Sequence, residues 1–345
     1  MSDPAINVTV AVCTYGRPRL LEQTLRGLVR QEYPSSWYEI IVVDNNSPDD
    51  STRTVVESFA GAQVAPQYVR EPRQGLSHAR NRAVMRSRGD VIVFADDDVI
   101  VEPHWLASLV APFAADRDLR IAVVAGEVIP VFSEGFPPWS ILLYQPLRFR
   151  PDAGPIDQMP MGANMAFRRT ALLEVGLFDT EVGRIGQMLF AGDENRPVKR
   201  LRQRSAEVWF VPEARVFHQL PRCRTTLAHA LRHGFDSARS RVLCRVAEQR
   251  AARRSCLAFL VTRFLANLAK AIACGLHGAL CTLLLQPGSA CPAFVRASRA
   301  CGYLWQISVF AARRVGVALS APLGELEPPV TQSLPIPEVS SVEPE

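Results

Sequence analysis

The 345-residue sequence contains neither of the two common glycine-rich phosphate loops. No GxGxxG opens a helix after the first apolar run, which excludes the dinucleotide-binding fingerprint, and the absence of GxxxxGK[ST] excludes a P-loop. A phosphate-bearing ligand would therefore have to be neutralised by a metal ion and by arginine side chains, instead of by a cradle of backbone amides.

Cysteine patterns for metal binding and a secretory leader are also missing. The eight cysteines show no CxxC pair and no repeated zinc-ligand spacing, so a thiolate zinc site is not expected. The first residues, Met1–Pro4, do not form a basic segment that leads into an apolar one. Free thiols in a reducing cytoplasm are the simplest interpretation.

The composition is that of a globular chain with an uneven charge distribution. With 48% hydrophobic and 21% charged residues, the chain is long enough for one large domain plus additions. The formal net charge is only +5, yet fifteen Lys and Arg residues face four Asp and Glu residues between Arg196 and Arg254. The segment from Ala321 to Glu345 has acidic residues and no basic one. This asymmetry indicates an anionic partner for the basic segment.

From Ile6 to about Gly126, short apolar runs alternate with amphipathic stretches. This pattern predicts an α/β fold in which helices cover both faces of a mostly parallel sheet. In such a sheet, ligands bind beyond the carboxyl ends of the strands. The expected strands are Val8–Cys13, Glu39–Asp44, Gln67–Arg70, Val91–Ala95 and Ile121–Ala125. The expected helices are Arg19–Gln31, Asp50–Ala60, Leu76–Ser87 and Pro103–Ala115.

Three consecutive aspartates, Asp96, Asp97 and Asp98, directly follow the apolar run Val91–Ala95. The run predicts a buried strand, so the three carboxylates should emerge where the strand leaves the sheet. A hard divalent cation such as Mg²⁺ would offset their repulsion, because it binds protein carboxylates together with substrate phosphate oxygens. Considered alone, the same residues fit a solvated acidic turn before the helix at Pro103 equally well.

Two further strand ends carry polar residues and favour the ligand-site interpretation. Thr14–Arg17 follows the first expected strand and Asp44–Ser47 follows the second. Because these ends share one edge of the sheet, their polar groups should converge with the aspartates on one ligand. Among the arginines that could neutralise phosphate, Arg80 is favoured over Arg17 and Arg73, since a solvated surface position is the commoner case for the latter two.

These residues resemble the family 2 glycosyltransferases, which have the nucleotide-diphospho-sugar transferase (GT-A) fold. Six ordered segments between Ile6 and Leu220 carry the resemblance and are together far more specific than any one of them. The resemblance implies a GT-A catalytic domain over residues 1–220 that moves a sugar from a nucleotide-diphosphate donor to an acceptor hydroxyl with inversion. The matching segments are Val10–Arg17, Ile40–Ser47, Gly75–Asn81, Phe94–Asp98, Gly162–Arg169 and Val211–His218.

The resemblance also implies roles for single residues. Asp44 is expected to recognise the nucleotide base, and Asp96 to lie beside the ribose. Asp98 is expected to bind a Mg²⁺ or Mn²⁺ ion on the diphosphate, and His218, after a late strand, to face the same metal. Further contacts to the nucleotide sugar are expected from Thr14, Tyr15, Arg17, Asn46, Arg80 and Asp97.

The expected chemistry needs a base as well as a metal. A divalent ion stabilises the charge that develops on the diphosphate leaving group, and a base takes the proton from the acceptor hydroxyl. Asp193 and Glu194 supply an acidic pair before the expected helix Arg196–Arg204, although an anonymous pair there would be interpreted as a helix cap. In the resembling family the second member of such a pair is the base, which implies Glu194. Asp193 is the alternative, because this chain reverses the usual Glu-Asp order.

The resemblance further implies an acceptor pocket and a single transfer. Gly162, Ala163 and Asn164 follow a loop without clear periodicity, and by resemblance they line the pocket for the sugar and the acceptor. Processive members of the family carry a Gln-x-x-Arg-Trp motif. Gln219–Cys223 lacks its Trp, so addition of one sugar is favoured.

The last third of the chain predicts a helical extension over residues 221–320. Arg224–Arg254 predicts a long basic helix, Cys256–Leu285 an apolar one and Gly302–Leu319 a further one. The apolar stretch is interrupted by charged residues and is too short to span a bilayer without them. Two interpretations stay open, an interfacial helix on an anionic membrane surface and a helical lid on the catalytic domain. Residues 321–345, rich in Pro, Ser and Glu, are expected to be disordered.

The sequence thus predicts a cytoplasmic, metal-dependent glycosyltransferase acting on a glycan or a lipid-linked acceptor, with peripheral membrane association as one possibility. A sugar-1-phosphate nucleotidyltransferase should carry a Gly-rich loop with Arg and Lys after its first strand, and none is found. The Arg-rich segment has few aromatics for stacking, so no nucleic acid partner is expected. A catalytically inactive nucleotide- or glycan-binding relative stays open, although intact Asp98, Glu194 and His218 favour an enzyme.

Overall fold

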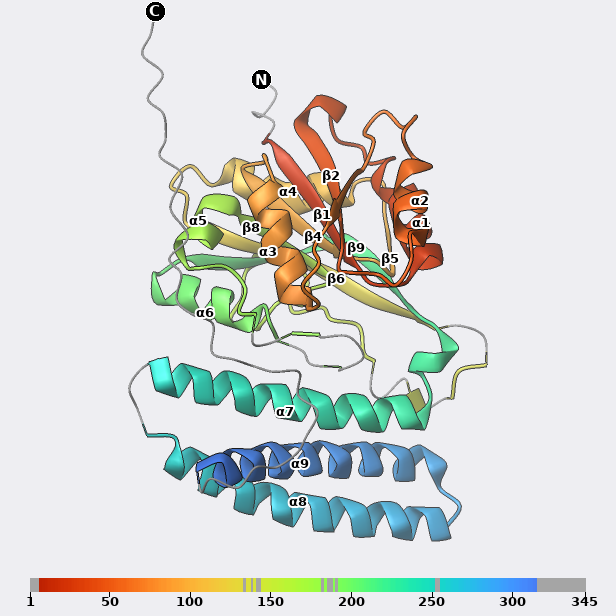
Figure 1. Ribbon diagram of the computed structural model, residues 1–345, viewed down its shortest axis with the longest axis vertical. Coiled ribbons are helices and arrows are strands. Elements are labelled where there is room, and N and C mark those ends of the chain that lie inside the picture. Colours follow the sequence, from red (N-terminus) through yellow and green to blue (C-terminus); the bar gives the residue numbers. More distant parts are fainter. Residues whose placement is uncertain are drawn as a thin grey trace, which may run out of the picture. The chain divides into compact units, whose positions relative to one another are not determined.

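The computed structural model describes residues 6–314, except 133–134, 138, 141–143, 181–182, 185–188, 190–191 and 252–254. Over this part, the chain builds a mixed β-sheet with helices on both faces, followed by three long helices (Figure 1). Residues up to Ile307 form one compact unit, and 308–314 belong to a second. The predicted disordered tail, 321–345, lies outside the described residues.

The N-terminal strands form a parallel half-sheet. β1 lies between β2 and β4, and β3 extends the sheet beyond β2. Nearly every residue of β1, β2 and β4 is buried, as is usual for strands covered by helices on both faces. Since the four strands run in one direction, their carboxyl ends meet at one edge of the sheet. The strands are β1 (Val8–Thr14), β2 (Tyr38–Asp44), β3 (Gln67–Arg70) and β4 (Val91–Asp96).

The remaining strands make the sheet mixed. β8 runs antiparallel to both β4 and β6, β9 runs parallel to β6, and β5 and β7 pair antiparallel with β9. The strand order is β3-β2-β1-β4-β8-β6-β9-β5. In the β5–β9 pair, Val99 lies opposite His218, which brings this histidine beside the aspartates that end β4. The strands are β5 (Val99–Val101), β6 (Ile121–Phe132), β7 (Gly154–Pro155), β8 (Asn164–Arg168) and β9 (Glu207–Leu220).

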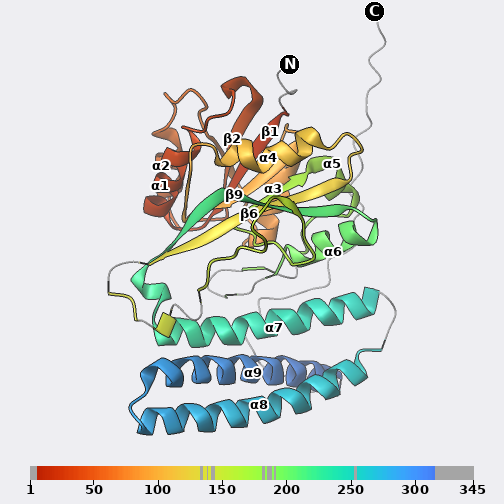
Figure 2. The same cartoon turned by 180° about the vertical axis from the view of Figure 1, so that it is seen from behind.

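Six helices cover the two faces of the sheet and enclose two hydrophobic cores (Figure 2). Successive side chains of a strand point to opposite faces, so Val10 and Val12 enter one core and Ala11 enters the other. Burying each large aliphatic side chain contributes roughly 1.5–3 kcal/mol before the entropy cost of folding. The first core packs against α1 (Pro18–Leu28), α2 (Ser51–Glu57) and α4 (Trp105–Ala115). The second packs against α3 (Leu76–Arg86), α5 (Arg169–Glu174) and α6 (Asn195–Gln203).

Three helices follow β9 and a short 3₁₀ turn: α7 (Leu227–Ala251), α8 (Leu257–Leu283) and α9 (Pro287–Arg314). Both cartoon views show α9 between α7 and α8 (Figures 1 and 2). A Cβ on Gly302 would lie 2.2 Å from the carbonyl oxygen of Phe235, so α9 and α7 approach each other at a position where only glycine fits.

The predicted helix Gly302–Leu319 begins too late, since α9 starts at Pro287. Pro292 lies inside α9 and hides the helical pattern of its first turns, because proline normally interrupts a helix. Residues 315–319 of the predicted helix lie outside the described residues.

Candidate active site

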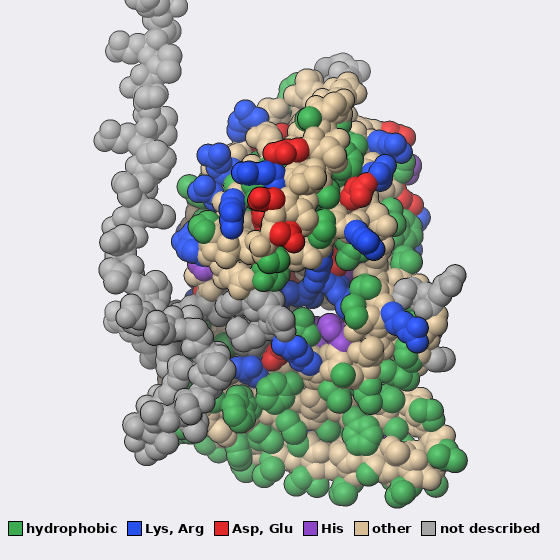
Figure 3. All heavy atoms as spheres, turned by 45° about the vertical axis from the view of Figure 1, so that its right-hand side comes forward, with side chains coloured by type: hydrophobic (Ala, Val, Ile, Leu, Met, Phe, Trp, Pro, Cys, Tyr) green, Lys and Arg blue, Asp and Glu red, His purple; other side chains and the backbone are tan. Residues whose placement is uncertain are grey.

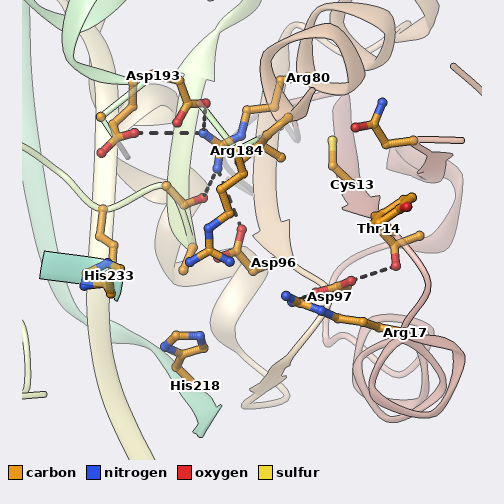
Figure 4. A pocket seen from close by; sticks show the side chains of 18 residues that line it. Cys13, Thr14, Arg17, Arg80, Asp96, Asp97, Arg184, Asp193, His218 and His233 are labelled. Carbon is orange, nitrogen blue, oxygen red and sulfur yellow. Dashed lines mark hydrogen bonds and ion pairs between the residues drawn. The ribbon is translucent and has the colours of Figure 1, made fainter. Parts of the chain in front are cut away.

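A cavity of about 230 Å³ opens at the carboxyl edge of the parallel strands (Figure 4). Its walls come from the ends of β1 and β4, the start of α3, the residues before β8 and α6, the end of β9, and α7. Eleven of the sequence-predicted site residues therefore meet around one space. These are Thr14, Tyr15, Arg17, Arg80, Asp96, Asp97, Gly162, Ala163, Asp193, Glu194 and His218.

The first two aspartates after the strand differ in their surroundings. The side chain of Asp96 is 33% exposed and faces the cavity. Asp97 is buried, accepts a hydrogen bond from Oγ1 of Thr14 at 2.7 Å, and pairs with Nη1 of Arg17 at 3.0 Å. Burial raises the pKa of Asp97, and the charge of Arg17 opposes this rise. Asp97 thus fixes the loop after β1, whereas Asp96 is open to a ligand.

Asp98 is the most buried of the three aspartates, with 1% of its surface exposed. Its Oδ2 is 2.7 Å from Nη1 of Arg224 and 3.2 Å from Nη1 of Arg17. Its Oδ1 lies 3.1 Å from Nε2 of His218, but the alignment is too poor for a hydrogen bond, so this buried oxygen has no directional donor. Burial alone would raise the pKa of Asp98. The contact with His218 and the charges of Arg224 and Arg17 outweigh burial and hold that pKa well below its usual range.

Asp96, Asp98 and His218 form a group that could hold a metal ion. Each offers one ligand atom, and these atoms lie within 4.8 Å of one another. Carboxylate oxygens with one imidazole suit Mg²⁺ and Mn²⁺. The poorly satisfied Oδ1 of Asp98, next to a histidine nitrogen, also fits a cation between them. The predicted pair Asp98 and His218 is thus brought together, and Asp96 joins it.

Arg80 links the aspartates to the acidic pair. Its buried guanidinium forms an ion pair with Asp193, donates to the carbonyl oxygen of Gly162 at 3.2 Å, and lies 3.7 Å from Oδ1 of Asp96. A Cβ on Gly162 would lie 2.4 Å from Nη2 of Arg80, so glycine permits this approach. Burial disfavours the charge of Arg80, but Asp193 and Asp96 outweigh burial and raise its pKa.

Glu194 differs from its neighbour Asp193. Burial, reinforced by the charge of Asp193, raises the pKa of Glu194 from 4.5 to about 8, although Arg80 opposes the rise from 4.0 Å away. Glu194 occupies the N-cap position of α6, but its side chain makes no capping hydrogen bond. The acidic pair therefore does not act as a helix cap here. One carboxylate is bound by arginine and the other faces the cavity with a strongly perturbed pKa.

Asp44 and Asn46, expected at the nucleotide, do not line this cavity. Asp44 is buried and accepts hydrogen bonds from the hydroxyl of Tyr68 at 2.7 Å and the amide of Ser47 at 2.9 Å. Asn46 accepts a hydrogen bond from Arg70 at 3.1 Å. Their contacts to a nucleotide stay a prediction.

Asn164, predicted for the sugar and acceptor pocket, does not line this cavity, and its contact with a sugar stays a prediction. It is fully buried, and its amide nitrogen donates to the carbonyl oxygens of Glu127 at 2.9 Å and Ala214 at 2.8 Å. Its Oδ1 accepts a hydrogen bond from Nε1 of Trp105 at 2.9 Å. With these bonds made, Asn164 joins β8, β6, β9 and α4 and has no free polar atom directed at the cavity.

Two arginines and one histidine of the site were not predicted from sequence. Arg184 and His233 line the cavity, and Figure 4 shows the side chain of Arg184 in its middle. Arg224 holds Asp98. Burial and the charge of Arg184 lower the pKa of His233 to about 4. For Arg224 and His233, the sequence signal was the density of basic residues after His218, which does not tell which side chains point inward.

The amino-acid sequence is similar to one family model and to individual known proteins. A family model described as glycosyl transferase family 2 matches residues 9–176. A glucosyl-dolichyl phosphate glucuronosyltransferase of Haloferax volcanii is 27% identical over 64% of this chain and 71% of that protein. The succinoglycan biosynthesis protein ExoM of Rhizobium meliloti is 27% identical over 70% of this chain and 75% of that protein.

Solved structures show the same fold. The mannosyltransferase PcManGT from Pyrobaculum calidifontis, in complex with GDP-Man and Mn²⁺, matches with a TM-score of 0.53 and 20% identity, over 93% of this chain and 77% of that one. GalNAc-T7 with UDP, GalNAc and Mn²⁺ matches with a TM-score of 0.51 and 20% identity, over 63% of this chain and 43% of that one.

The strand order and the two solved structures show the GT-A fold, which confirms the predicted fold class. Residues 9–176 match glycosyl transferase family 2, and the protein is a glycosyltransferase.

Proposed function

We propose that the protein is an inverting, metal-dependent glycosyltransferase that moves one sugar from a nucleotide-diphosphate donor to an acceptor hydroxyl. One observation carries the proposal. The possible metal ligands Asp96 and His218 and the perturbed acid Glu194 border one cavity, and Arg80 lies between the two groups. This arrangement serves both halves of a transfer, the departure of the diphosphate and the activation of the acceptor.

At the donor half, Asp96, Asp98 and His218 would hold a divalent ion on the diphosphate oxygens. The ion would stabilise the negative charge of the leaving group. The two solved glycosyltransferases of similar fold contain Mn²⁺ together with GDP-Man or UDP, which supports a donor of this class. Thr14, Tyr15 and the other strand-end residues remain the proposed contacts to the donor.

At the acceptor half, Glu194 is the proposed base. Direct attack by an acceptor oxygen inverts the anomeric centre and needs one group to take the proton, without a covalent sugar intermediate. Asp193 suits this role less, because Arg80 stabilises its ionised form and keeps it in an ion pair. The raised pKa of Glu194 makes its carboxylate a stronger proton acceptor.

For the acceptor we propose a glycan on a lipid carrier. One relative, a glucosyl-dolichyl phosphate glucuronosyltransferase, supports this class, and another, a succinoglycan biosynthesis protein, supports a role in polysaccharide synthesis. The missing Trp after Arg222 favours a single addition. All eight cysteines are free thiols, which supports a site of action in the cytoplasm.

The test is a thermal-shift screen of UDP, GDP and other nucleotide diphosphates, each with and without Mn²⁺ or Mg²⁺. One nucleotide should raise the melting temperature only together with the metal, since a ligand at about 100 times its Kd stabilises the folded state by ~2.7 kcal/mol. Asp96→Asn and Asp98→Asn should both abolish the metal-dependent part of the shift.

The two substitutions control for each other. Asp98→Asn also takes the carboxylate from Arg224, although Arg17 keeps Asp97, whereas Asp96 is partly exposed and its neighbour Arg80 keeps Asp193. A nucleotide shift that is equal with and without metal, or that survives both substitutions, would refute the metal-assisted mechanism. Transfer assays with the matching nucleotide sugar then identify the sugar.

A further inference from the structure

An apolar stripe runs along the whole exposed side of α8. Its members recur every three or four residues, so they lie on one face of the helix and cover roughly 120° of its circumference. Each is between 41% and 81% exposed. In Figure 3, hydrophobic side chains cover the lower end of the molecule, where α8 and α9 lie in Figure 1. The α8 stripe consists of Leu257, Val261, Leu265, Leu268, Ile272, Leu276, Leu280 and Leu283.

The other side of α8 already has a partner. Asn267, Gly278 and Cys281 are the buried residues of the helix. A Cβ on Gly278 would lie 2.8 Å from the ring of Phe294 in α9, so the two helices are in close contact there. The stripe is therefore the side left over after packing. Its exposure is not the result of a helix lying free of the protein.

Charge around the stripe has one sign. The chain has no acidic residue between Glu248 and Glu325. On α8, Arg263, Lys270 and His277 follow one another at seven-residue spacing, which places them along one line on the polar side of the helix, roughly 150° around its axis from the middle of the stripe. A second copy of this chain would bring like charges together at such an interface. An anionic surface would complement them.

The helix is better suited to lie in a membrane surface than to cross it. Its 27 residues, about 40 Å long, are long and apolar enough to cross a bilayer, and an 18-residue stretch has a mean hydropathy of 1.6. However, a crossing would place Asn267 and Lys270 near the centre of the bilayer, where polar and charged groups are costly. The close contact with α9 would also draw the exposed Arg296 and Arg299 of that helix into the lipid.

We propose that α8 is the membrane-docking element of this protein and that its partner is an anionic lipid surface. The α8 stripe inserts among the acyl chains at the level of the headgroups. Arg263 and Lys270 lie on the polar side of the helix, where their charge attracts the anionic surface. The attachment does not depend on the sugar-transfer chemistry, so it can be tested without donor or acceptor.

The experiment is flotation of the full chain with vesicles of phosphatidylcholine alone or with about one third phosphatidylglycerol. The chain should bind the anionic vesicles, and binding should weaken as the salt concentration rises. Leu265→Glu and Ile272→Glu should each weaken binding about tenfold or more, because each removes a large apolar side chain from the inserted face. Lys270→Glu should remove the preference for anionic lipid.

Met85→Glu is the matched control, since Met85 is 55% exposed on α3, away from the stripe, and the variant should bind as the unchanged chain does. Equal binding by the stripe variants, or no binding to anionic vesicles, would overturn the proposal. A dimer in light scattering that the stripe substitutions dissociate, without vesicle binding, would instead make this face an interface between copies. The nucleotide thermal shift of each variant should stay unchanged, so failure of docking and failure of the proposed function give different results.

Discussion

Glu194 and Asp193 are neighbours in sequence with opposite electrostatic surroundings. Arg80 forms a buried ion pair with Asp193, which keeps that carboxylate ionised and occupied. Glu194 is left with burial and a negative neighbour, both of which favour its protonated form. Two adjacent carboxyls are thereby separated into a fixed anion that positions Arg80 and an acid that can exchange a proton.

Replacing Glu194 with Gln should therefore remove turnover without removing the donor site. The amide keeps the shape of the side chain but cannot accept the proton, so kcat should fall by about 10²–10⁴-fold. The metal-dependent nucleotide shift should be nearly unchanged. Asp193→Asn is the comparison, and it should lower the melting temperature because it leaves the buried Arg80 charge without its main partner. Full activity in Glu194→Gln would contradict the assignment.

The pKa of Glu194 also predicts a pH profile. A base works in its deprotonated form, so kcat/KM should rise about tenfold per pH unit below a pKa of about 8 and level off above it. Stability should respond in the opposite sense. The pKa is raised from 4.5 by folding, so the stabilising contribution of this group is lost as pH rises from 4.5 through about 8. A flat kcat/KM profile between about pH 6 and 9, a range that extends roughly one unit or more on either side of this pKa, would rule out Glu194 as the base.

At the scale of elements, the amide of Asn164 joins four of them. It satisfies the buried carbonyl oxygens of Glu127 and Ala214 and the indole nitrogen of Trp105. Asn164→Ala should lower the free energy of unfolding by about 3 kcal/mol or more, because each unsatisfied buried polar group costs about 1–3 kcal/mol. Thermal or urea unfolding measures this loss. Met161→Ala, at the cavity wall, should have little effect. If Asn164→Ala left stability unchanged and abolished activity, that result would instead support the predicted contact between Asn164 and the sugar.

Two glycines test the packing of the C-terminal helices. Gly302→Ala would place a Cβ against the carbonyl oxygen of Phe235 and should force α9 away from α7, at a cost of about 1–3 kcal/mol. Gly275→Ala is the matched control, because nothing lies within 4 Å of its added Cβ, and it should stabilise α8 by about 0.5–1 kcal/mol. Unfolding midpoints compare the two. Equal effects would mean that α9 does not pack tightly on α7.

For the whole molecule, the sequence predicted the strands that have a clear local pattern and the segments that resemble the family. The strands β1 to β4 match their expected bounds within one residue, and β1, β2 and β4 were easy to place because they are short and mainly apolar. β6 continues past the expected Ala125 to Phe132, since its later residues pair with β9 despite the polar Glu127 and an irregular register. Such pairing depends on a distant strand and leaves little trace in the local pattern.

The residues of the candidate site also differ in whether the sequence could predict them. Asp98 and His218 are 120 positions apart, and only their places in two family segments indicated that they meet. Arg184 and His233 belong to no segment of that kind, and their contribution depends on how α7 and the chain before α6 come to lie beside the cavity. The burial of Asn164 likewise follows from four elements that meet around it. The division of the chain at residue 220 and the individual ligand contacts stay predictions.

Arg224 is a counterion for Asp98 that the chain itself supplies. Its guanidinium neutralises Asp98 from 2.7 Å, so an incoming Mn²⁺ must exchange with a charge that the chain itself supplies. Mn²⁺ alone should therefore bind weakly. Its affinity should rise when a nucleotide diphosphate is present, because Arg224, displaced from Asp98 by the ion, can then pair with the diphosphate oxygens. Arg224→Gln should strengthen calorimetric binding of free Mn²⁺ and reduce the synergy between metal and nucleotide; unchanged synergy would contradict this. The consequence is an order of events, in which the ion and the nucleotide load together.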